Sequence, residues 1–115
     1  QRMARIIGTG PAMELIYTAD TIDANRALEI GMVNHVVPAD QLMDEAMKLA
    51  EKICKNAQKA IRASKLAIRR GMDCDISTAV SYEALAFATC FGTEDQKEGM
   101  QAFLEKRKEK HFKNA

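Results

Sequence analysis

Apolar residues recur at helical spacing through the middle of the chain. Over residues 40–55 they are three or four positions apart, and charged side chains fill the other faces. The apolar positions are Leu42, Ala46, Leu49, Ala50 and Ile53. This period predicts an amphipathic helix with one apolar stripe.

Two more helices are predicted directly after it. Over residues 57–70 the positions expected to be buried are Ala57, Ile61, Ser64 and Ile68, while the other faces are strongly basic. The helix over residues 75–90 is apolar around much of its circumference, including Phe87. Such a helix is either deeply buried or pressed against a partner.

Capping residues divide the remaining sequence into short helices. Helices are expected over residues 1–7 and 11–18, followed by a helix over 24–30 with Asp23 as its N-cap and Gly31 as its stop. A last helix begins after Thr93, which with Gln96 forms a capping box. The cations that follow are expected in its last turn, where they suit the helix dipole.

The clear strand candidate is the segment over residues 32–37, which is β-branched and closed by Pro38. A proline suits an edge strand or a single added strand better than the centre of a sheet. The sequence therefore predicts a mainly α fold with at most one short strand near residues 33–37.

Charge and cysteine usage exclude several classes of protein. Seventeen basic residues against sixteen acidic ones give a net charge of +1, so nucleic acid is not expected as a partner. No apolar run approaches the roughly eighteen residues of a membrane span. Three widely separated cysteines form neither a disulfide framework nor a zinc motif, and they favour a reducing cytoplasm.

Few residues carry recognisable chemistry. His35 and His111 lack partners at metal-ligand spacing, so no metal site is predicted. Glu14 and Glu83 lie on predicted helices and would suit acid or base catalysis only if they were buried. The cluster Lys106-Arg107-Lys108 suits a phosphate ligand or a solvated helix end.

Several segments resemble the crotonase, or enoyl-CoA hydratase, family over essentially the whole chain. They are Ile6-Ile7-Gly8, Ala12-Met13-Glu14-Leu15, Ala27-Leu28-Glu29-Ile30-Gly31-Met32-Val33-Asn34 and the stretch from Phe91-Gly92-Thr93-Glu94-Asp95-Gln96 to Lys106-Arg107. The segment from Gly71 to Ile76 is similar to bacterial 3-hydroxybutyryl-CoA dehydratases. The resemblance implies the helical C-terminal trimerisation domain of the crotonase fold, covering residues 1–115.

The same resemblance implies a carbon-oxygen lyase acting on short-chain enoyl-CoA thioesters such as crotonyl-CoA. In the family, two backbone N–H groups stabilise the charge on the thioester oxygen and two glutamates handle the water and the α-proton. All four groups lie before the position that matches Gln1, in an N-terminal ββα spiral domain expected to be absent. No catalytic residue is therefore assigned, and the 115 residues alone are expected to be inactive.

What the resemblance assigns to this chain concerns binding and assembly. Phe87 matches an aromatic position lining a neighbouring subunit's site, and Lys106 matches a basic position near the nucleotide end of coenzyme A. The parent would form a trimer or a dimer of trimers, with acyl-CoA as substrate and with neither a metal nor a redox cofactor. Two alternatives stay open: another reaction of the family, such as isomerisation or acyl-CoA hydrolysis, and a stand-alone oligomerisation or binding module.

Overall fold

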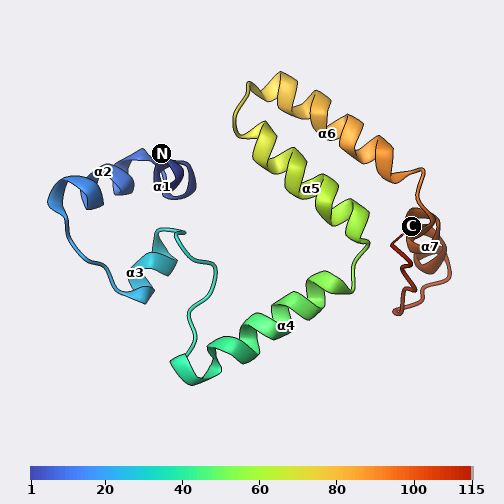
Figure 1. Ribbon diagram of the computed structural model, residues 1–115, viewed down its shortest axis with the longest axis horizontal. Helices are drawn as coiled ribbons and strands as arrows, with labels where there is room; N and C mark the ends of the chain where they lie inside the picture. Colours follow the sequence, from blue (N-terminus) through green and yellow to red (C-terminus); the bar gives the residue numbers. More distant parts are fainter. Residues whose placement is uncertain (115) are drawn as a thin grey trace. The chain divides into compact units, whose positions relative to one another are not determined.

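The regular structure in residues 1–114, the part that the computed structural model describes, is entirely helical (Figure 1). The chain divides into two compact units, residues 1–45 and residues 46 onward. None of the helices in the described part has the length and apolar character needed to cross a membrane. The predicted mainly α fold is confirmed.

The first unit contains three short helices, α1 (Arg2–Ile7), α2 (Thr9–Thr18) and α3 (Ala24–Glu29). α1 and α2 pack against each other across Gly8, whose φ of 85° permits the sharp reversal between them. Ile7 and Ala12 are buried. The Asp23 side chain accepts a hydrogen bond from the backbone N–H of Arg26 at 2.8 Å, which confirms the predicted N-cap of α3.

The segment over residues 32–37, predicted as the one strand, is irregular in the structure. It connects α3 to a single 3₁₀ turn, η1 (Ala39–Gln41), and Val33 and Val36 are each more than a third exposed. A strand requires a second strand to accept its backbone hydrogen bonds. Residues 1–114 contain no such strand, so the β-branched composition alone produces no sheet.

The second unit is built from longer helices. α4 (Leu42–Cys54) begins in the last residues of the first unit, and α5 (Gln58–Gly71), α6 (Ile76–Cys90) and α7 (Glu94–Leu104) follow. α5 and α6 form an antiparallel hairpin (Figure 1). A Cβ added at Gly71 would lie 3.3 Å from the Ala79 Cβ, so this glycine lets the two helices approach closely.

The buried face of α5 agrees only in part with the predicted one: Ala57 and Ile61 are half-buried, as predicted, but Ser64 and Ile68 are not. Ile68 is 67% exposed and Ser64 is also exposed, whereas the half-buried positions include Ala60, Ala63 and Ala67. Small side chains spaced three or four residues apart allow helices to pack at short distance. The face used for packing is therefore the alanine face, and the larger apolar residue Ile68 is exposed.

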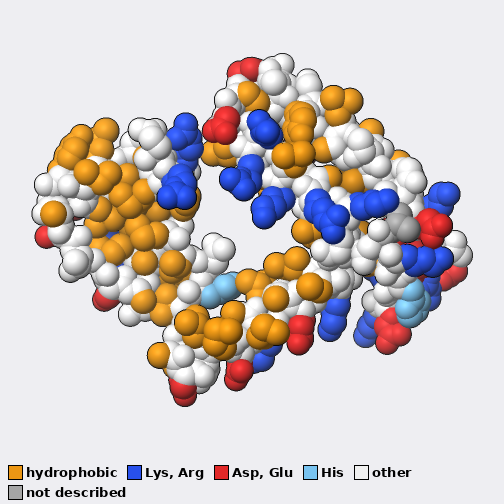
Figure 2. Space-filling model, viewed as in Figure 1, with side chains coloured by type: hydrophobic (Ala, Val, Ile, Leu, Met, Phe, Trp, Pro, Cys, Tyr) orange, Lys and Arg blue, Asp and Glu red, His pale blue; other side chains and the backbone are white. Residues whose placement is uncertain are grey.

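Large apolar side chains are exposed on many of the helices, as Figure 2 shows for one face of the molecule. On α6 no residue is fully buried, and Ile76, Leu85 and Phe87 are each about two-thirds or more exposed. Deep burial of α6, one of the two expectations for this helix, is therefore wrong for these residues. The exposed apolar surface fits the other expectation, a helix that packs against a partner.

Candidate functional site

The residues with the most connected polar contacts lie at the end of α7 and in the tail after it. α7 starts at the predicted cap, where the Thr93 hydroxyl accepts a hydrogen bond from the backbone N–H of Gln96 at 3.1 Å. The helix ends at Leu104, with Glu105 as its C-cap. Both ends of α7 are thus fixed by specific contacts.

Lys106 occupies the left-handed conformation that closes α7, with φ of 55°. Its N–H donates to the Phe103 carbonyl at 3.1 Å, and the Arg107 N–H donates to the Ala102 carbonyl at 2.8 Å. This pair of hydrogen bonds defines a Schellman motif, a position where glycine is usual. A side chain with a Cβ costs about 1–2 kcal/mol there.

The same motif closes α3, and there the left-handed residue is a glycine. Gly31 has φ of 75°, its N–H donates to Leu28 and the Met32 N–H donates to Ala27. The chain therefore uses glycine at one such position and lysine at the other. The left-handed conformation of Lys106 ends the helical path of the chain. The tail cations therefore follow α7 and do not lie in its last turn, contrary to the prediction.

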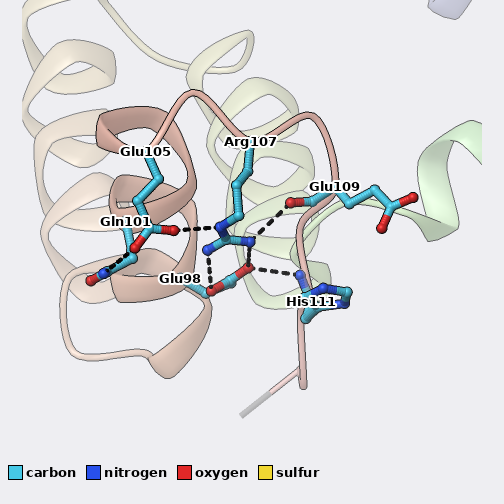
Figure 3. Close-up of polar contacts among 6 residues, drawn as sticks. All are labelled: Glu98, Gln101, Glu105, Arg107, Glu109 and His111. Atoms are coloured by element: carbon cyan, nitrogen blue, oxygen red, sulfur yellow. Dashed lines mark hydrogen bonds and ion pairs between the residues drawn. The ribbon is translucent and has the colours of Figure 1, made fainter.

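Arg107 is the centre of a polar cluster (Figure 3). Its guanidinium makes two hydrogen bonds to the Glu98 carboxylate, at 3.0 and 3.1 Å, and donates to the Glu105 carboxylate and to the Glu109 carbonyl. The Glu98 carboxylate also accepts from the backbone N–H of His111 at 2.9 Å. We refer to Glu98, Glu105 and Arg107 as the Arg107 clasp.

The clasp shifts the titration of its members. Hydrogen bonds from the Arg107 side chain, and next from the His111 N–H, lower the pKa of Glu98 to about 2 from 4.5. The pKa of Glu105 is also lowered, chiefly by the Gln101 side chain and then by Arg107. The pKa of Arg107 is raised, first by Glu98 and then by Glu105. At neutral pH all three groups are charged.

Beyond the clasp the tail returns along α7. The Asp95 carboxylate, which is 2% exposed, accepts hydrogen bonds from the backbone N–H groups of Lys113 and Asn114. The Asn114 side chain in turn accepts from the backbone N–H of Gln58 at 3.1 Å, at the start of α5. The tail therefore links the two helices α7 and α5.

A cavity of about 850 Å³ lies between the tail and the segment that joins α4 to α5. Its lining includes four lysines against the single carboxylate of Glu109, namely Lys55, Lys108, Lys110 and Lys113. Lys113 is paired with Glu94 at 3.2 Å. The excess of positive charge favours an anionic ligand.

The residues predicted to bind coenzyme A are both exposed. Lys106 follows α7 directly, and within residues 1–114 it forms no ion pair. Phe87 on α6 is 65% exposed and its ring contacts Phe91 edge to face, with 5.1 Å between centroids. Phe87 lies on α6 and Lys106 in the tail after the C-cap of α7, both in the second unit, and their side chains are open to a further molecule.

The other residues considered from sequence form no site. Glu14, Glu83, His35 and His111 are exposed, so burial gives neither glutamate a role in acid or base catalysis. No group of three or more His, Cys, Asp or Glu side chains in residues 1–114 is placed to hold a metal ion. The clasp and the buried Asp95 were missed, since charged residues near a helix end are ordinarily solvated.

The sequence of this chain is similar to those of known proteins. The chain belongs to the enoyl-CoA hydratase/isomerase family, whose model matches residues 1–114. It is 54% identical over 114 residues to the short-chain-enoyl-CoA hydratase of Clostridium acetobutylicum, covering 99% of this chain and 44% of that protein. The crotonyl-CoA hydratase of Syntrophomonas wolfei is 53% identical over 108 residues, covering 94% of this chain and 42% of that protein.

A solved structure agrees with the sequence relatives. The enoyl-CoA hydratase of Bacillus anthracis superposes with a TM-score of 0.94 and 43% identity, covering 100% of this chain and 44% of that one. The family resemblance drawn from the sequence is thereby confirmed. The chain spans less than half the length of these three relatives.

Proposed function

We propose that this chain is the helical C-terminal part of a short-chain enoyl-CoA hydratase, or 3-hydroxybutyryl-CoA dehydratase. The parent would add water reversibly to trans-2-enoyl-CoA thioesters such as crotonyl-CoA. The observation that carries the proposal is the identity of more than half the residues to two proteins named for this activity. The reaction involves no redox change, so the proposal includes no redox cofactor; it also includes no metal, because an oxyanion hole and two glutamates would supply the catalysis.

Within that enzyme the chain would serve assembly and closure of the coenzyme A site. Phe87 and Lys106 would contact the coenzyme A of a neighbouring subunit in a trimer or a dimer of trimers. The exposure of both side chains and the apolar surface of α6 support this role. The parent would work in the cytoplasm, which suits the free thiols of Cys54, Cys74 and Cys90.

The N-terminal ββα spiral domain of the family would supply the oxyanion hole and both catalytic glutamates. The chain alone is therefore expected to be inactive. The exposure of Glu14 and Glu83 supports this expectation, because neither carboxylate has the buried setting of a tuned acid or base.

The test compares the chain alone with a fusion in which it replaces the corresponding C-terminal segment of the Clostridium acetobutylicum relative. We expect the fusion to hydrate crotonyl-CoA and the chain alone to leave it unchanged, as followed by the loss of enoyl-thioester absorbance. An inactive but folded and assembled fusion would contradict the proposal. Hydration by the chain alone would contradict the assignment of catalysis to the N-terminal domain.

The family's name also includes isomerases, and this favours a shift of the double bond as the second candidate reaction. The product separates the two candidates: hydration gives a 3-hydroxyacyl-CoA, whereas isomerisation moves the double bond without adding water. Mass spectrometry of the fusion's product distinguishes them, since only hydration adds the mass of one water.

A further inference from the structure

Arg107 binds the chain on both sides of Lys106. Its guanidinium contacts the carboxylate of Glu105, the residue before Lys106, and the carbonyl of Glu109, three residues after it. The two hydrogen bonds to Glu98 anchor the same guanidinium to the body of α7 (Figure 3). One planar side chain thus ties the segment containing Lys106 to the helix.

The clasp also pairs carboxylates close in sequence to Lys106 with the Arg107 guanidinium. Glu98 is the carboxylate of α7 that is nearest in sequence to Lys106, and Glu105 is the C-cap of the helix. Arg107 donates hydrogen bonds to both carboxylates. An arginine fork satisfies two carboxylate oxygens in fixed geometry, which a lysine cannot do. Lys106 therefore stays exposed, with its charge available to an external anion.

The backbone of Lys106 is unfavourable for a lysine and therefore needs support. Its φ of 55° lies in the region that glycine prefers. Residues in such conformations persist where surrounding contacts over-determine them, and they concentrate at binding sites. The Schellman hydrogen bonds and the Arg107 clasp are the contacts that hold this one.

We propose that Arg107 is a positioning residue: its clasp on Glu98 and Glu105 holds Lys106 left-handed and keeps its ammonium free for a phosphate of coenzyme A. The role of Lys106 in this inference rests on the proposed function. Arg107 itself does not contact the ligand. The basic cluster of the tail is thus divided into a structural cation, Arg107, and a recognition cation, Lys106.

The experiment uses Arg107→Gln in the 115-residue chain, with Lys108→Gln as a control that removes the same charge from the other neighbouring cation. The intraresidue amide-to-Hα nuclear Overhauser effect at residue 106 reports a positive φ. We expect Arg107→Gln to weaken it and Lys108→Gln to leave it unchanged. Glu98→Gln, which opens the clasp from the side of α7, should act like Arg107→Gln, and circular dichroism checks that the helices remain.

Coenzyme A titration of the assembled fusion with the Clostridium acetobutylicum relative, which supplies the rest of the proposed site, is the second measurement. Lys106→Gln and Arg107→Gln should each weaken binding by about two- to fivefold, as expected for one exposed ionic contact. The double variant should bind no more weakly than Lys106→Gln alone. A further loss of affinity in the double variant would mean that Arg107 touches the ligand. An unchanged φ at residue 106 in Arg107→Gln would mean that Arg107 does not hold Lys106. Either result overturns the inference.

The two proposals fail in different ways. If the Lys106→Gln fusion binds coenzyme A as well as the unmodified fusion, the binding role under the proposed function is wrong. In that case a loss of the positive φ in Arg107→Gln still supports the structural half of the inference.

Discussion

The buried carboxylate of Asp95 accepts a hydrogen bond from the backbone N–H of Lys113 at 2.7 Å, joining positions 18 residues apart. Asp95 lies in the first turn of α7, where an acidic residue also suits the helix dipole. The same carboxylate also accepts hydrogen bonds from the backbone N–H of Asn114, at 3.0 and 3.1 Å. The tail therefore depends on this carboxylate.

We expect Asp95→Ala to lower the free energy of unfolding by about 2 kcal/mol, since hydrogen bonds to a charged acceptor contribute roughly 1.5–3 kcal/mol. Glu94→Ala is the matched control, because it removes an acidic side chain from the same turn but one that is exposed and makes only a surface ion pair with Lys113. Its cost should stay below about 1 kcal/mol. Urea unfolding gives both values, and equal losses would contradict the special role of Asp95.

How much the sequence predicts differs between local and tertiary features. The caps formed by Asp23 and Thr93 and the stop at Gly31 were predicted, because a cap depends on side-chain chemistry within three residues of the helix end. The helix bounds accordingly agree to within a few residues. The strand candidate over 32–37 does not form a strand, because strand formation requires a partner that composition does not reveal.

The residues of the candidate site were harder to predict, for a physical reason in each case. Asp95 has the sequence signature of an ordinary solvated first-turn acid, and only the returning tail buries it. Lys106 occupies a position where sequence rules expect glycine, so its left-handed conformation leaves no signal. The packing face of α5 was predicted only in part, because alanines contribute little to an apolar pattern beside Ile68.

The two Schellman motifs predict opposite effects of substitution. Lys106→Gly should stabilise the chain by about 0.5 kcal/mol, because relief of the left-handed strain exceeds the added entropy of an unfolded glycine. Gly31→Ala should lower the free energy of unfolding by about 1 kcal/mol. No heavy atom lies within 4 Å of the added Cβ, so this loss would report backbone strain and not a steric clash. Thermal unfolding of both variants measures the effects, and a destabilising Lys106→Gly would show that the lysine side chain contributes to folding.

Acid should open the Arg107 clasp. The pKa of Glu98 is lowered to about 2 in the folded chain from 4.5, so its contribution to stability is complete above about pH 4.5 and is lost as pH falls toward 2. Hydrogen exchange of the His111 amide, which donates to Glu98, should therefore gain protection as pH rises through this window, after correction for intrinsic exchange. In Glu98→Gln the corrected protection should be low and flat, and a similar pH dependence in that variant would assign the effect to another group.

The Phe87 ring serves either folding or recognition in this chain, and its truncation tests which. A fully buried phenylalanine costs about 3–5 kcal/mol when cut to alanine. Phe87 is 65% exposed and its ring packs edge to face against Phe91, so Phe87→Ala should cost only about 1 kcal/mol of folding free energy. Phe91→Ala, which breaks the same pair from the other side, is the control and should cost a similar amount. A loss near 4 kcal/mol for Phe87→Ala would make the ring a core residue, whereas a small loss leaves its exposed face available for a ligand or a neighbouring subunit.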